Sequence, residues 1–127
     1  MNNVKRCPLI AVCMLAACGG AVTTAAATAP ATIPLTEEVS ADPSLVFTPG
    51  TVTIQRGGSV VIDFGPVAHN VFFDNQPAGA PPNIDGTNAN VSKSLTFSTA
   101  GTFVYNCHIH PGMHGTVVVV APRASVP

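Results

Sequence analysis

Short strand-like runs separated by glycine and proline fill the chain from about residue 46 onward, and they limit the possible folds more than any other feature. Residues 51–54 alternate polar and apolar side chains, and residues 59–64 form another such run after a turn at 57–58. Similar runs lie at 69–74, 94–98, 102–107 and 115–121. This spacing predicts an all-β domain, built as an antiparallel sandwich or a small barrel.

A segment rich in proline and glycine lies between two of these runs, at 75–90. It is long for a simple connection in a compact domain. Either it holds a short irregular element or it has a function of its own, and the sequence does not decide between these alternatives.

The first 17 residues have the layout of a secretory signal peptide. Lys5 and Arg6 precede an uncharged run at 7–17, which is too short to span a bilayer as an anchor. The run closes on Leu-Ala-Ala-Cys at 15–18, which resembles the bacterial lipobox, where cleavage before the cysteine leaves it to carry lipid. We therefore predict a signal peptide over 1–17 and a lipid anchor on Cys18. An ordinary signal peptide cut at a similar place is the alternative.

A segment of unusual composition follows the predicted cleavage site. Residues 19–34 are almost all alanine, threonine, glycine, valine and proline, and such a segment buries too little apolar surface to offset the entropy of ordering it. The sequence predicts a flexible tether over 18–36 and one folded domain over 37–127. Gly19 stands where an aspartate often retains a lipoprotein at the inner membrane, so we expect the cell envelope, with the outer membrane favoured over the inner.

Charged residues are few in this chain, at 9% of the total. Without the signal peptide, three basic side chains face six acidic ones, which leaves a net charge of −3. A mildly acidic domain lacks the basic patch that nucleic-acid binding requires. We therefore expect no nucleic-acid partner.

Cys107 is the one cysteine left in the predicted domain, because Cys7 and Cys13 leave with the signal peptide and Cys18 carries lipid. No disulfide framework is available, and an exposed thiol in an oxidising compartment is prone to oxidation. Phe103, Tyr105 and Cys107 are two residues apart, so on a strand their side chains point to the same face, which should be the core. The thiol is thus expected to be buried or bound to a metal.

The residues that follow Cys107 have metal-ligand spacing. Cys107, His110 and Met113 lie three residues apart in one predicted loop, and His69 begins a strand elsewhere in the domain. Two imidazoles, one thiolate and one weak thioether are the ligands of the trigonal copper sites that transfer electrons. The sequence predicts that these four side chains bind one copper ion that alternates between Cu(I) and Cu(II).

At this point the sequence resembles the cupredoxins, the blue copper proteins that include plastocyanin, pseudoazurin and, above all, amicyanin. The resemblance spans roughly 42–121 and includes the Cys-x-x-His-x-x-Met loop, the His-Asn-Val segment at 69–71 and the closing strand. It implies a Greek-key β-sandwich, with His69, Cys107 and His110 as strong copper ligands and Met113 as the weak axial ligand. It also implies that Asn70 supports the ligands by hydrogen bonds near the residue after the cysteine. That residue is His108 here, where the family usually has a small hydroxylic one.

Each candidate ligand also has a simpler interpretation. Cys107 could be an ordinary core thiol, His69 a histidine that merely begins a strand, and Met113 core filling. His108 should point to the opposite face from Cys107, away from the ion. His114 is expected at the surface, with ligation or partner docking as its alternatives.

Other metal proteins share parts of this pattern. The four histidines are too few for the additional copper cluster of a multicopper oxidase, and zinc gains nothing from an axial methionine. We predict a monomeric one-electron carrier in the periplasm, not an enzyme, whose redox protein partners dock near His110. A copper carrier, a small copper enzyme with an open coordination position, and a metal-free interaction module remain as alternatives.

Overall fold

The computed structural model describes residues 20–21, 25–26 and 31–123. The predicted signal peptide, the lipid site Cys18 and part of the tether lie outside these residues. Every strand of the described residues lies in one unit, Ala31–Pro127. No helix among the described residues has the length and apolar character needed to cross a bilayer.

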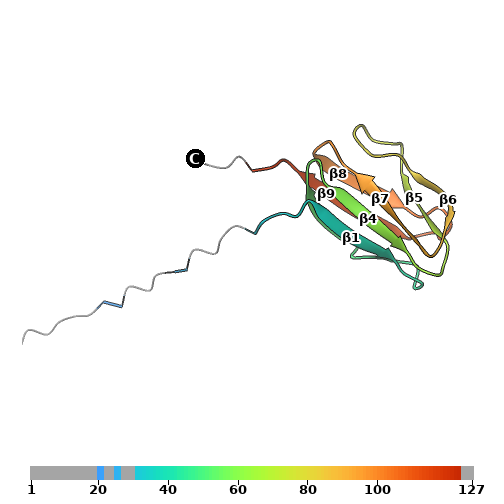
Figure 1. Ribbon diagram of the computed structural model, residues 1–127, viewed down its shortest axis with the longest axis horizontal. Coiled ribbons are helices and arrows are strands. Elements are labelled where there is room, and N and C mark those ends of the chain that lie inside the picture. The colour runs from blue at the N-terminus through green and yellow to red at the C-terminus, as the bar shows by residue number, and fades with distance from the viewer. Residues whose placement is uncertain (1–19, 22–24, 27–30, 124–127) are drawn as a thin grey trace, which may run out of the picture. The chain divides into compact units, whose positions relative to one another are not determined.

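The domain consists of strands arranged in two sheets, as Figure 1 shows. The strands are β1 (Thr36–Ala41), β2 (Phe47–Thr48), β3 (Thr51–Gln55), β4 (Ser59–Phe64), β5 (His69–Phe73), β6 (Ile84–Asn88), β7 (Val91–Thr96), β8 (Gly101–Asn106) and β9 (His114–Val120). One sheet has the order β2-β1-β4-β7 and the other β3-β9-β8-β5-β6. The predicted all-β fold is confirmed for the part of the chain that the structure describes.

The sheets are mixed, whereas the sequence predicted antiparallel ones. β1 pairs with β4 in parallel, and β3 pairs with β9 in parallel. In both cases the paired strands are far apart along the chain, and the segment between them crosses to the other sheet. Alternation of side chains reveals a strand but not its neighbour, so this pairing was not visible in the sequence.

Part of the segment at 75–90 is regular after all. Residues Ile84–Asn88 form β6, which pairs with β5 at the edge of the five-stranded sheet. The register between the two strands shifts between His69 and Val71, which is a β-bulge or a similar irregularity. Of the two alternatives left open, the structure therefore supports a short element with an irregular pairing.

The core lies between the sheets and is built from alternate side chains of the strands. Phe103, Tyr105 and Cys107 are all buried on one side of β8 and its continuation, as their shared parity predicts. The Tyr105 ring packs edge-on against Phe47 at a centroid distance of 4.8 Å. Glycine at 115 is required because a Cβ there would overlap the Tyr105 ring. Close packing at this point supports the start of β9 directly behind the predicted metal-binding loop.

The residues just before β1 are attached to the domain. The main-chain oxygens of Pro34 and Leu35 accept hydrogen bonds from Gln55 and Ser59, at 2.9 and 2.8 Å. The Gln55 side chain donates to the oxygen of Ile33 at 2.6 Å. Residues 33–35 lie in the predicted tether, yet these bonds attach them to β3 and β4.

Candidate metal centre

Two separate parts of the domain bring the predicted ligands together. His69 is the first residue of β5, whereas Cys107, His110 and Met113 lie between β8 and β9. The second segment closes on itself, because the Cys107 N–H donates to the Met113 oxygen at 2.9 Å and the Met113 N–H to the His110 oxygen at 3.2 Å. Pairing of β8 with β9 down to Asn106 and His114 fixes the base of this loop. Strand pairing and loop closure thus determine where the ligands lie.

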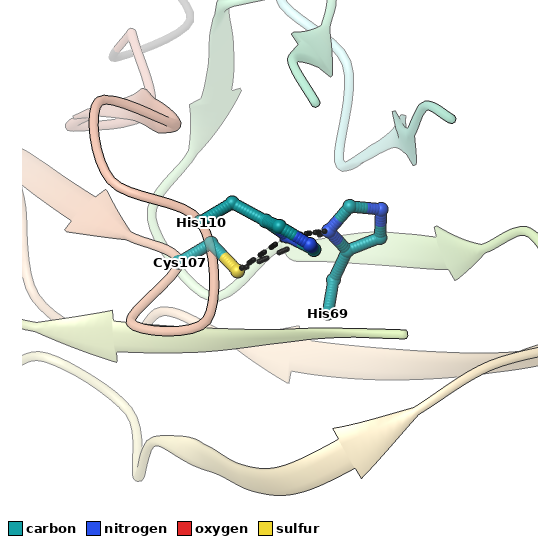
Figure 2. A group of neighbouring side chains, drawn as sticks. All are labelled: His69, Cys107 and His110. Carbon is teal, nitrogen blue, oxygen red and sulfur yellow. Dashed lines mark hydrogen bonds between the residues drawn. The ribbon is translucent and has the colours of Figure 1, made fainter. Parts of the chain in front are cut away.

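Three side chains of this set point toward one another (Figure 2). The Cys107 sulfur lies 3.6 Å from Nδ1 of His110 and 3.9 Å from Nδ1 of His69. The two Nδ1 atoms are 3.1 Å apart. Metal–nitrogen and metal–sulfur bonds are about 2.1 and 2.3 Å long. One ion can therefore contact all three atoms at once, so the donor set fits the copper that the sequence predicted.

Burial differs between the members of the site. His69, Cys107 and Met113 are almost completely buried, whereas His110 is half-buried. Pro111 and Gly112, next to His110, are exposed. The site is therefore shielded from solvent on the side of the core and reaches the surface through His110.

His69 is held in the uncharged form that a metal ligand needs. Burial lowers the pKa of its imidazole below the usual 6.5, and the neighbouring His110 lowers this pKa further. Asp42 raises it by a smaller effect. Among the described residues, Nε2 of His69 has no hydrogen-bond partner. Nδ1 is the ring nitrogen that faces Cys107 and His110.

The loop is also tied to β5 by Asn70. Its side-chain oxygen accepts a hydrogen bond from the His108 N–H at 2.7 Å. The His108 ring points away from the three ligand atoms and stacks on Phe72. His114 is exposed, and its Nδ1 lies 3.0 Å from the Gly112 oxygen. The structure thus places Asn70 as a link between the two ligand segments and leaves the His108 and His114 rings outside the cluster.

Sequence reasoning missed one residue that supports the site. Asn88 on β6 is buried, and its side-chain amide donates to the oxygens of His69 and Asp85 at 3.1 and 3.0 Å. This bond braces the main chain of a ligand from the neighbouring strand. A polar residue in a segment that was not recognised as a strand carries no local signal of this role.

Comparison with known proteins agrees with this geometry. The model of the family "Copper binding proteins, plastocyanin/azurin family" matches residues 35–120. Plastocyanin from Scenedesmus fuscus is 40% identical over 86 residues, which cover 60% of this chain and 88% of that protein. Amicyanin from Paracoccus versutus has a TM-score of 0.55 at 28% identity, covering 72% of this chain and 84% of that one. A mutant fern plastocyanin has a TM-score of 0.56 at 28% identity, and the match covers 65% of this chain and 98% of that one. The resemblance to the cupredoxins is confirmed, and the chain belongs to the plastocyanin/azurin family of copper-binding proteins.

Proposed function

We propose that the domain carries single electrons between redox proteins on one copper ion, which His69, Cys107, His110 and Met113 would hold. The observation that supports this most directly is the cluster of two Nδ1 atoms and one sulfur, all within 3.9 Å of one another, in a copper-binding family. Copper, when bound, supplies the one-electron couple. The side chains supply a soft thiolate that favours the reduced ion and imidazoles that accept both oxidation states.

The protein contributes a ligand set that moves little when the electron is transferred. His69 is fully buried in β5, and Asn88 holds its main chain. Cys107 and Met113 are joined by a main-chain hydrogen bond across the loop. Because both segments are fixed in advance, oxidation and reduction require little rearrangement, and a small rearrangement keeps the barrier to electron transfer low.

Electrons enter and leave through His110 in this proposal. His110 is the half-buried ligand, and the residues around it are exposed: Ile109 at 37%, together with Pro111 and Gly112. A small, largely uncharged surface of this kind suits brief contacts between redox proteins, which bury less area than stable complexes. We propose that redox partners dock here and that the protein acts as a monomer.

Electron carriage is favoured over catalysis and over copper delivery. Four protein ligands would hold the ion, and three of them (His69, Cys107 and Met113) are buried, so a substrate would have little access to it and we propose that the protein is not an enzyme. Burial of His69 and Cys107 disfavours the rapid exchange of copper that a metal carrier needs.

For the rest of the chain we propose a signal peptide over 1–17, a lipid on Cys18 and a tether that ends before residue 33, where hydrogen bonds to β3 and β4 attach the main chain to the copper domain. This arrangement would hold the carrier in the cell envelope, on the outer membrane in preference to the inner one. Incorporation of labelled fatty acid into the expressed full-length chain tests the proposal. We expect labelling of the wild type and none of the Cys18→Ser variant, and equal labelling of both would contradict it.

The decisive experiment is the visible and electron paramagnetic resonance spectrum of the mature chain with copper(II). An intense blue band with narrow hyperfine splitting, bleached reversibly by reduction, is expected from a thiolate-bound trigonal site. The His110→Ala variant should lose this spectrum, whereas His114→Ala, which changes an exposed imidazole outside the cluster, should keep it. A wild type with a pale spectrum and rapid copper exchange would favour copper delivery instead.

A further inference from the structure

Four side chains on the outer face of β5 and β8 contact one another beside the metal centre. Phe72 and Asn106 are paired across the two strands. The Asp74 carboxylate accepts a hydrogen bond from the Asn106 amide, and the His108 ring lies flat on Phe72, with centroids 4.1 Å apart and 13° between the ring planes. We call Phe72, Asp74, Asn106 and His108 the outer clamp.

The outer clamp holds the chain on both sides of the thiolate ligand. Asn106 immediately precedes Cys107 and His108 immediately follows it. Asp74 holds the first of these neighbours and Phe72 the second, both from the same segment that begins with His69. The His108 N–H also donates to the side-chain oxygen of Asn70, so a second contact from β5 holds the residue after Cys107. The position of the Cys107 sulfur relative to the β5 ligand therefore depends on these contacts.

The contacts of the outer clamp are directional, and two of its members, Asp74 and His108, are exposed. The side chains of His108 and Asp74 are 53% and 62% exposed, and His108 Nε2 is 3.6 Å from Asp74 Oδ1, too far for a hydrogen bond. Exposed contacts of this kind contribute little to the free energy of unfolding. Partners that orient metal ligands, by contrast, change metal affinity about 10–100-fold when they are lost. The clamp should therefore affect the metal centre much more than the fold.

We infer that Asp74 and Phe72 are positioning residues of the copper centre, which act on Cys107 through Asn106 and His108. The inference rests on the proposed function, because it concerns the geometry of the same site. The Asp74 carboxylate fixes the side chain before the thiolate, and the Phe72 ring fixes the side chain after it. Together they keep the sulfur in one orientation toward the two imidazoles in both oxidation states.

The test compares variants that remove these contacts with one that keeps the hydrogen bond but removes the charge. In the mature copper-loaded chain, Asp74→Ala and Phe72→Ala should each lower copper(II) affinity about tenfold and broaden the hyperfine pattern of the paramagnetic spectrum. Asp74→Asn retains an oxygen that accepts from Asn106, so its affinity and spectrum should stay close to those of the wild type. Asn106→Ala should change the copper affinity and the spectrum as much as Asp74→Ala does. The variant with both changes should show no further loss, because both changes remove the same hydrogen bond.

Asp63→Ala is the matched control. This carboxylate also accepts one side-chain hydrogen bond, from Ser92 at 2.9 Å, but on the other sheet, so its loss should leave the spectrum unchanged. Urea unfolding should show nearly equal stabilities for the metal-free Asp74→Ala and Asp63→Ala proteins, whereas Phe72→Ala removes a half-buried ring and should be less stable. A blue wild type with unaltered affinity and spectrum in Asp74→Ala and Phe72→Ala would overturn the inference. Equal effects of Asp74→Asn and Asp74→Ala would also overturn it, since charge alone would then explain them. A wild type without the blue spectrum would instead overturn the proposed function.

Discussion

His69 and His110 offer the same chemical group from two regions that are held in different ways. His69 lies in β5, is fully buried, and has its main chain fixed by Asn88 of the neighbouring strand. His110 is half-buried in the loop between β8 and β9, which is closed by its own main-chain hydrogen bonds. One ligand is part of the core and the other belongs to a surface loop. Fold stability and metal binding should therefore respond separately to changes in the two regions.

The largest effect is expected from Cys107→Ser, at the point where the strand region passes into the loop. Loss of the thiolate should abolish the blue band completely, because that band arises from sulfur bound to copper. The metal-free variant should lose about 1–3 kcal/mol of stability, since a hydroxyl would be buried without an assured partner. Absorption and paramagnetic resonance spectra, with urea unfolding of the metal-free protein, measure both effects. A retained blue band would show that another atom is the principal ligand.

Substitution of each histidine by alanine tests the comparison directly. Both His69→Ala and His110→Ala should lose the blue copper site. In the metal-free protein, His69→Ala should reduce the free energy of unfolding by about 1–3 kcal/mol through the cavity it leaves, whereas His110→Ala should change it by less than about 0.5 kcal/mol. Denaturant unfolding of the metal-free variants measures the difference. Equal destabilisation would mean that the loop is as much a part of the core as β5.

The pH dependence of stability should distinguish the two regions by a smaller effect. Because burial lowers the pKa of His69, the unfolded chain binds more protons than the folded one as the pH falls. In the metal-free protein, the contribution of His69 to the free energy of unfolding should be complete above about pH 6.5. It should be lost progressively as the pH falls below this value. Urea midpoints between neutral and mildly acidic pH measure this loss. His69→Ala should reduce this loss of stability at acidic pH. His110→Ala should largely preserve it, since burial is the main cause of the lowered pKa of His69. The reverse pattern would contradict the comparison.

The smallest change is expected from Met113→Leu, at the end of the loop. Leucine has nearly the same volume, so stability should change by less than about 1.5 kcal/mol. The blue band should remain, and the reduction potential should rise, because the axial thioether donates to the oxidised ion and leucine does not. Voltammetry and unfolding measure the two outcomes. An unchanged potential would show that Met113 only fills the core.

Much of the candidate site could be predicted because its loop ligands are local. Cys107, His110 and Met113 stand at fixed spacing, and their chemistry identifies the metal without knowledge of the fold. The supporting residues could not be found in this way. Asn88 acts on His69 only because β6 pairs with β5, and Asp74 reaches Asn106 only because β5 pairs with β8. Both roles depend on which strands become neighbours.

The same distinction holds for the fold. Alternating side chains and the turns between them determined where most strands lie and that Phe103, Tyr105 and Cys107 face the core. These features are local, since they follow from the two-residue period of a strand. Only the tertiary structure decided that β1 and β4, and β3 and β9, run parallel. It also decided that His69 meets Cys107, 38 residues later, at 3.9 Å. Pairing of distant segments depends on how whole faces pack together, and no short stretch of sequence contains that information.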